Sequence, residues 1–198
     1  WLFILHVYNG AILLHASSVK IDGKVYAFCA HGGVGKTSLC GWAFLNKNAA
    51  FISDDLLPVN VEGEAIPSEI FVHIYPYNQM ENFLWKGKWS LRRVHWELRK
   101  RMLGPRRVCA RKSAREVYPR VTERAYPIDF IVWLSRTDGE PSLEKVDVEQ
   151  FVADHFSILK HELRRAFRFF EVSGGGGFDS FPKGFEEHVR TTLENNIR

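Results

Sequence analysis

Residues 24–55 read KVYAFCAHGGVGKTSLCGWAFLNKNAAFISDD, and the order of patterns in this stretch indicates the fold class. It opens with an apolar run, passes through a glycine cluster into a helical pattern at 37–46, and ends on a second apolar run followed by Asp54-Asp55. A strand, a helix of about ten residues and a further strand in so short a span predict a βαβ unit with parallel strands. Ligands of such sheets bind at the carboxyl ends of the strands, so we expect the glycine cluster and the two aspartates to face one another across a single crevice.

A β-hairpin is predicted directly before this unit. Residues 11–30 contain two apolar arms around Asp22-Gly23, a dipeptide typical of tight hairpin turns. The second arm, VYAFCA at 25–30, is apolar at almost every position, whereas a strand with one solvent face would alternate. We therefore expect a central strand that is covered on both faces, as in α/β proteins.

The glycine cluster has the pattern of a phosphate-binding loop. Residues 30–37, here called the glycine loop, read AHGGVGKT, a Walker A sequence with Ala30 in place of the first glycine. Glycines let successive backbone N–H groups curve around a phosphate, and the following helix adds its positive N-terminal end. In such a loop Lys36 reaches the β- and γ-phosphates, and the Thr37 hydroxyl ligates Mg²⁺. The residues expected to bind the nucleotide are His31, Gly32, Gly33, Val34, Gly35, Lys36, Thr37 and Ser38.

Two adjacent carboxylates follow the next predicted strand. Asp54-Asp55 begins 18 residues after Lys36. Beside a γ-phosphate, one carboxylate can hold Mg²⁺ while the other accepts the proton of an attacking hydroxyl. The structural alternative is a solvated turn or a helix N-cap. A GTPase is disfavoured, because the NKNA sequence at 46–49 lacks the aspartate of a guanine-reading NKxD motif.

His15, the glycine loop and Asp54-Asp55 together resemble the catalytic domain of HPr kinase/phosphorylase and its relatives, which share a core with phosphoenolpyruvate carboxykinase. The resemblance covers about residues 11–60, from the His15 strand through the glycine turn and the phosphate loop to the two aspartates. It implies an α/β fold with a P-loop core of this type, in which a mixed central sheet is flanked by helices.

The resemblance also implies a role for each matching residue. Lys36 would bind phosphate, Thr37 would bind Mg²⁺, Asp54 would be the general base, and Asp55 would assist the metal. His15 would lie near the carboxylates and the transferred phosphoryl group. As a single histidine in an apolar strand, His15 equally fits a hydrogen-bonded core position.

Positive charge is concentrated in one segment. Residues 86–120, here called the basic segment, hold 13 Lys/Arg and two acids for a net charge of +11, which leaves −7 for the rest of a chain whose total is +4. We expect it to form a basic helical insertion or lid within a single domain spanning 1–198. The arginines expected to contact phosphate or the acceptor are Arg92, Arg93, Arg106 and Arg107.

A helix is predicted inside the basic segment and is expected to end at Gly104-Pro105. Its apolar residues recur at the spacing of three and four that places side chains on one helix face. We expect this stripe to be buried. Its members are Leu91, Val94, Leu98 and Met102.

Composition excludes several classes of protein. The 198 residues are 45% apolar and 14% aromatic, which fits a globular domain with a sizeable core rather than a disordered chain. No apolar run approaches the roughly 18 to 20 residues that span a bilayer. Three cysteines without a CxxC pair favour reduced thiols and a cytoplasmic protein. Because the chain begins at Trp1 in an apolar run, we expect it to be trimmed from something longer.

The leading hypothesis is an ATP·Mg²⁺-dependent phosphotransferase that acts on a hydroxyl group. The acceptor would be a serine of a small protein or peptide, or a small-molecule alcohol, and the oligomeric state stays open, with a homo-oligomer allowed. The alternative is a nucleotide-gated module that binds nucleic acid through the basic segment, whose Trp89 and Trp96, with the preceding Trp85, could stack bases. A family member that binds nucleotide without transfer is disfavoured, because Lys36, Thr37 and both aspartates are present.

Overall fold

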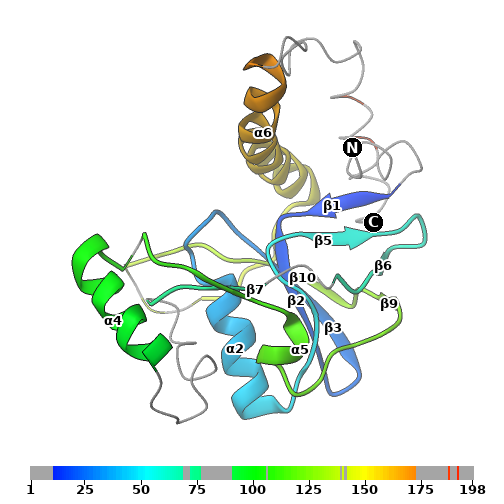
Figure 1. Ribbon diagram of the computed structural model, residues 1–198. Coiled ribbons are helices and arrows are strands. Elements are labelled where there is room, and N and C mark those ends of the chain that lie inside the picture. The colour runs from blue at the N-terminus through cyan, green and yellow to red at the C-terminus, as the bar shows by residue number, and fades with distance from the viewer. Residues whose placement is uncertain are drawn as a thin grey trace.

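The structure is a computed structural model that describes residues 11–68, 72–76, 91–105, 107–138, 140 and 142–172, and the single positions 187 and 191. Within these residues the fold is mixed α/β, with three sheets and four helices (Figure 1). The elements are β1 (Ile12–Leu14), β2 (Ala16–Ile21), β3 (Lys24–Cys29), α2 (Lys36–Lys47), β4 (Ala50–Ser53), β5 (Leu57–Val59), β6 (Glu64–Ala65), β7 (Val72–Ile74), α4 (Leu91–Leu103), β8 (Ala110–Lys112), α5 (Ala114–Val117), β9 (Tyr126–Pro127), β10 (Phe130–Trp133) and α6 (Val148–Val172).

The central sheet has the strand order β10-β3-β2-β4. Its first hairpin joins β2 to β3 through Asp22-Gly23, whose φ angles of 49° and 86° are the positive values that a type I′ turn requires. The predicted hairpin is therefore confirmed for residues 16–29, whereas residues 12–14 of its expected first arm pair with β5 instead. β10 pairs with β3 in parallel, so residues after β10 and residues after β3 emerge at the same edge of the sheet.

The predicted βαβ unit has two strands that run in the same direction, as expected, but these strands are not neighbours in the sheet. α2 leads from β3 to β4, but β2 lies between these strands and is antiparallel to both. β3 and β4 consequently run the same way, two positions apart, and still end at the same edge of the sheet. The pairing of β2 with β4 could not be predicted from local pattern, because it joins residues 30 or more positions apart.

A second four-stranded sheet has the order β1-β5-β6-β9. Its strand β1 is separated from strand β2 of the central sheet by a single residue. β1 ends at Leu14 and β2 begins at Ala16, so His15 is the residue at which the chain passes from one sheet into the other. His15 is 4% exposed. This junction fixes its backbone from both sides and carries its side chain to the site described below.

The central strand β3 is covered on both faces, as its sequence predicts. Val25 and Ala27 pack in a cluster that also contains Phe151 of α6, whereas Phe28 packs in a second cluster with Phe44 of α2. Burial of this apolar area on two sides is the main stabilising term for the sheet. Among the described helices, none combines the length and the hydropathy that crossing a bilayer would require.

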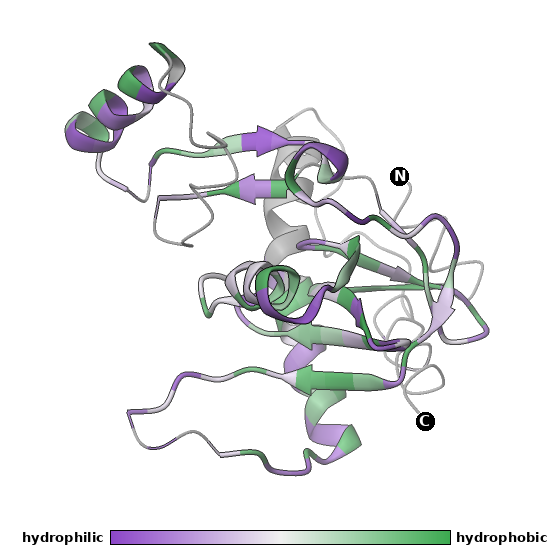
Figure 2. Ribbon diagram, turned by 90° about the horizontal axis from the view of Figure 1, so that it is seen from below, coloured by the Kyte–Doolittle hydropathy of each residue, from purple (hydrophilic) through white to green (hydrophobic). Residues whose placement is uncertain are grey.

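The α4 helix contradicts one prediction. It spans Leu91–Leu103 and is followed by Gly104 at a φ of 82°, so the predicted end is confirmed. The stripe expected to be buried is exposed, however, with Leu91 at 89% and Met102 at 75% relative exposure, and the residue turned inward is Trp96 at 5%. In Figure 2, α4 stands away from the central sheet beyond the β7–β8 ribbon. Helical spacing identifies an apolar face but does not say what covers it.

Asp147 with Gln150 three residues later predicts the start of a helix, and α6 begins there. The apolar side chains expected on its inner face are Phe151, Phe156, Leu159, Leu163 and Phe167. The Asp147 carboxylate accepts a hydrogen bond from the backbone N–H of Gln150 at 3.0 Å, which satisfies one N–H group of the first turn. Phe151 and Leu159 face the core, as expected. The side chains of Leu163 and Phe167 lie outside the described residues. The glycine run at 174–177, for which the sequence predicts a flexible connection, and most of residues 184–196, for which it predicts a helix, also lie outside them.

Candidate functional site

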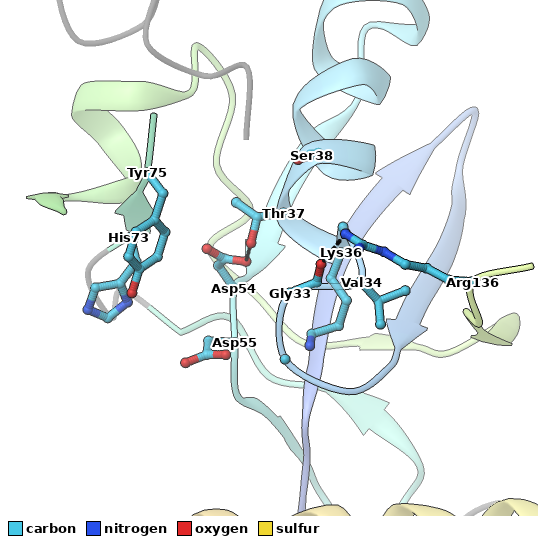
Figure 3. Close-up of a pocket in the computed structure, with 12 residues that line it drawn as sticks. Gly33, Val34, Lys36, Thr37, Ser38, Asp54, Asp55, His73, Tyr75 and Arg136 are labelled. Carbon is cyan, nitrogen blue, oxygen red and sulfur yellow. Dashed lines mark hydrogen bonds between the residues drawn. The ribbon is translucent and has the colours of Figure 1, made fainter. Parts of the chain in front are cut away.

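A pocket of about 370 Å³ lies at the carboxyl ends of β3 and β4 (Figure 3). This volume is within the range of about 300 to 1,000 Å³ that is usual for small-molecule sites. The expectation that the glycine loop and the two aspartates share one crevice is confirmed. The lining residues are Gly32, Gly33, Val34, Gly35, Lys36, Thr37, Ser38, Asp54, Asp55, His73, Tyr75 and Arg136.

The glycine loop is shaped by two residues with positive φ. Gly33 and Gly35 have φ angles of 80° and 124°, conformations that side-chain-bearing residues rarely adopt. A Cβ at either position would meet no atom within 4 Å, so backbone conformation rather than lack of space requires glycine there. α2 starts immediately afterwards, and Gly35 offers no side chain to cap it. The start of α2 therefore has no side-chain cap, and an uncapped helix start of this kind can bind an anion through N–H groups of its first turn.

The Lys36 ammonium is held inside the glycine loop. It donates to the carbonyl oxygen of Ala30 at 2.9 Å, and it lies 2.9 Å from Nε2 of His15. Because an ammonium group can only donate, Nε2 of His15 is the acceptor and its proton belongs on Nδ1. That nitrogen faces the Asp55 carboxylate at 3.8 Å. His15 thus links the loop lysine to one of the two carboxylates.

Asp54 is buried and joins the glycine loop to β2. Its Oδ1 accepts hydrogen bonds from the Ser17 hydroxyl at 2.5 Å and from the Thr37 hydroxyl at 2.8 Å. Burial raises the pKa of the Asp54 carboxyl above its ordinary value, while these two hydrogen bonds act in the opposite direction. The end of β4 and the first turn of α2 are therefore fastened together through a carboxylate.

Asp55 has the opposite environment. Its side chain is 57% exposed, and its carboxylate lies in the pocket on the side of His73 and Tyr75 (Figure 3). Its φ of 68° is in the left-handed region, which aspartate tolerates better than most residues. This backbone turn lets two consecutive residues present one buried and one accessible carboxylate to the same space.

Arg136 is a pocket residue that the sequence did not single out. β10 pairs with β3 so that Trp133 is opposite Cys29, and the chain beyond β10 therefore passes beside the glycine loop. From there Arg136 donates through Nη2 to the Gly33 carbonyl oxygen at 2.7 Å. In the sequence, Arg136 is marked only by its position shortly after an apolar strand. This position indicates a pocket residue only once the strand is known to pair with β3.

Of the four arginines expected at the site, the two whose side chains the structure describes are not brought to it. Arg93 and Arg107 are described and do not line the pocket. The Arg92 side chain and Arg106 lie outside the described residues. A guanidinium beside the glycine loop is supplied by Arg136 instead.

Three further residues near the pocket were not identified from the sequence. His73 and Tyr75, from β7 and its end, form the wall opposite Lys36 and Arg136, with the aspartates between them (Figure 3). His155 of α6 accepts a hydrogen bond through Nε2 from the His15 backbone N–H at 3.1 Å. Burial lowers the pKa of His155 to about 4, with the nearby His15 acting in the same direction. A neutral His155 therefore holds His15 in place.

The donor set suits Mg²⁺ better than a softer metal. Thr37, Asp54 and Asp55 offer oxygen atoms only, and Mg²⁺ is usually held by one or two carboxylates together with water and substrate phosphate. Across the described ranges, no group of three or more His, Cys, Asp or Glu side chains is arranged to hold a metal. Thr37, Asp54 and Asp55 are the pocket residues that could hold Mg²⁺ together with water and ligand oxygens.

Searches against protein-family models and against curated proteins find no match to this chain. The function is accordingly inferred from the chemistry of the pocket.

The buried His155 predicts a stability change with pH. Its pKa is about 4 in the folded protein, against an ordinary value of 6.5, so the unfolded state binds more protons between these values and folding stability falls as the pH falls through them. From pH 7.5 to pH 5 this group should remove about 2 kcal/mol of unfolding free energy. Urea denaturation should show that His155→Gln, which keeps an acceptor, loses less over this interval than wild type does. The exposed His161→Gln serves as the control, and an equal pH dependence in all three proteins would contradict the assignment.

Asp54 is expected to change folding stability with pH in the opposite direction. Because its pKa is raised in the folded protein, stability that is present at low pH is lost as the pH rises through that pKa. Asp54→Asn keeps an oxygen for Ser17 and Thr37 and should raise the unfolding free energy of the ligand-free protein at pH 8. The gain should shrink as the pH is lowered. Destabilisation at pH 8, judged against Asp138→Asn at the surface, would mean that the hydrogen bonds to the carboxylate outweigh its burial.

Proposed function

We propose that this protein is an ATP·Mg²⁺-dependent phosphotransferase of the HPr kinase/phosphorylase type, with a P-loop core, that transfers the γ-phosphoryl group to a hydroxyl. The acceptor would be a serine of a small protein or peptide, or a small-molecule alcohol. One observation carries the proposal. Lys36, Thr37 and two carboxylates in opposite environments line a single pocket, and Thr37 is hydrogen-bonded to Asp54.

The nucleotide would bind with its phosphates at the glycine loop. The N–H groups of the loop and of the first turn of α2 would donate to phosphate oxygens, and Lys36 would exchange its carbonyl contacts for the β- and γ-phosphates. Arg136 adds a second cation, because its guanidinium has five donors and the Gly33 carbonyl accepts from one nitrogen. These groups stabilise negative charge with little covalent chemistry of their own.

Mg²⁺ would be held on the Asp54 side of the pocket. Thr37 and Asp54 are already joined at 2.8 Å, the pairing of loop hydroxyl and strand-end carboxylate that holds Mg²⁺ in nucleotide-hydrolysing P-loop proteins. When bound, Mg²⁺ neutralises charge on the transferring phosphate. Burial raises the pKa of the Asp54 carboxyl, and a metal partner would favour its ionised form.

The general base would be Asp55. The acceptor reaches the pocket from solvent, and Asp55 is the accessible carboxylate, whereas Asp54 is 3% exposed and occupied by two hydroxyls. Asp55 would take the proton of the acceptor hydroxyl while the oxygen of that hydroxyl attacks the γ-phosphorus. The bond from that phosphorus to the β–γ bridging oxygen breaks, and the nucleoside diphosphate leaves. The geometry thus favours the reverse of the division of roles that the family resemblance implies.

His15 would orient this base. Its Nδ1–H faces Asp55, its Nε2 accepts from Lys36, and its backbone is held by His155. We place it among positioning residues because these contacts join the phosphate-binding and proton-accepting sides of the pocket.

The buried Cys29 and Cys40 thiols fit a cytoplasmic protein, and burial raises the pKa of Cys29 to about 12.

The nucleic-acid-binding alternative gains little support. Trp96, one of three tryptophans considered for base stacking, is 5% exposed and so is not accessible to a base. Trp85 and Trp89 lie outside the described residues. The alternative stays a prediction that rests on the charge of the basic segment and on these two tryptophans.

The proposed base can be tested by substitution. Asn tolerates the left-handed backbone at position 55 as well as Asp does, so Asp55→Asn should keep the pocket intact. With γ-labelled ATP and serine-containing peptides or glycerol as acceptors, transfer should fall by about 10²- to 10⁴-fold. Calorimetry should show unchanged binding of a non-hydrolysable ATP analogue, whereas Lys36→Ala should weaken that binding.

Asp138→Asn, which removes an exposed carboxylate outside the pocket, is the matched control. Transfer by Asp55→Asn at the wild-type rate would rule out Asp55 as the base.

A further inference from the structure

The α4 helix exposes a continuous apolar stripe. Leu91, Val94, Leu98 and Met102 are 89%, 43%, 55% and 75% exposed, and their spacing places all four on one face. Trp96 lies on the opposite face and is buried. The helix is thus anchored through Trp96 while its apolar stripe faces solvent. Exposed apolar surface that is contiguous commonly marks an interaction site.

Charge surrounds this stripe. α4 carries five Lys/Arg residues and a single acid, Glu97. By helical spacing, Arg99 and Arg101 flank the stripe on its two sides, and both are exposed. A surface with an apolar centre and a cationic border is complementary to a partner with apolar and acidic side chains.

The stripe belongs to the same structural unit as one wall of the pocket. α4 lies in the chain between β7 and β8, which pair antiparallel, and β7 leads into Tyr75. His73 and Tyr75 face Asp55 from the side opposite the glycine loop (Figure 3). That is the side from which an acceptor hydroxyl would have to approach the proposed base.

We propose that α4 is the docking site for the phosphoryl acceptor, and that this acceptor is a polypeptide with an amphipathic, acidic segment rather than a small-molecule alcohol. The proposal rests on the proposed function and names its acceptor class. An acidic helix laid along the stripe would bury the four apolar side chains, and its carboxylates would meet Arg99 and Arg101. Its serine would enter the pocket between Asp55 and the β7 wall.

A lipid surface could use the same apolar and cationic groups. The polypeptide is favoured because α4 is carried on the strand pair that forms the acceptor side of the pocket, where a phosphorylatable hydroxyl is required. An anionic membrane is therefore treated as an outcome of the test.

The first experiment measures docking alone. Two fluorescein-labelled amphipathic peptides carry leucine at helical spacing and one serine, and they differ only in having glutamate or lysine at the polar positions. Fluorescence anisotropy with the full chain should show binding of the glutamate peptide, weakened by added salt, and no binding of the lysine peptide. Leu98→Asp should weaken binding by about tenfold or more. Leu45→Asp, at a 70% exposed leucine of α2, should leave it unchanged.

Three results would overturn the docking site. They are equal binding of both peptides, equal binding by wild type and Leu98→Asp, and binding of phosphatidylserine-containing vesicles without binding of the glutamate peptide. A non-hydrolysable ATP analogue is titrated into the same proteins, and its binding should be unaffected by Leu98→Asp.

The second experiment separates this proposal from the proposed function. With γ-labelled ATP, Leu98→Asp should raise KM for the glutamate peptide by about tenfold with kcat nearly unchanged, and should not alter transfer to free serine. Transfer to free serine without α4-dependent peptide binding would refute the dock and leave the phosphotransferase standing. Peptide binding through α4 in a protein that binds no nucleotide would refute the phosphotransferase instead.

Discussion

The hydrogen bond from the Thr37 hydroxyl to the Asp54 carboxylate is the interaction on which the rest of the site depends. At 2.8 Å it fastens the first turn of α2 to the end of β4, across the strand β2 that supplies Ser17 to the same oxygen. Burial of the carboxylate raises its pKa, so the ligand-free fold holds this group at a cost in stability. Groups whose ionisation is disfavoured by their surroundings are concentrated at functional sites, where a bound ligand or cation can stabilise the ionised form.

The two aspartates show how one backbone turn creates two chemistries. Asp54 is buried at the strand end, and Asp55, at a positive φ, projects an exposed carboxylate into the same pocket. His15 connects the accessible carboxylate to Lys36, and its backbone lies at the junction of two sheets. The environment of each group, rather than its residue type, is what separates a metal-binding role from a proton-accepting one in the proposed mechanism.

Local sequence pattern predicts the parts of this protein that are determined locally. The Asp22-Gly23 turn, the strand before the glycine loop and the helix after it follow from residue types at fixed spacing. Pairing between distant strands does not, which is why β2 between β3 and β4 was not foreseen and why Arg136 was not recognised beside the loop. The spacing of the α4 stripe predicts burial, but periodicity identifies only that a helix has an apolar face and not whether another element covers it. The division of roles between the aspartates depends on burial, which the sequence Asp-Asp cannot convey.

The most direct test of the account measures nucleotide binding with and without Mg²⁺. Calorimetric titration of a non-hydrolysable ATP analogue into wild type should give binding that Mg²⁺ strengthens by about tenfold or more, since Thr37 and Asp54 would hold the metal on the nucleotide. In Asp54→Asn the metal-free binding should persist and the effect of Mg²⁺ should disappear. Absence of nucleotide binding by wild type, or an identical Mg²⁺ dependence in the two proteins, would contradict the central claim that this pocket is a metal–nucleotide site organised by Asp54.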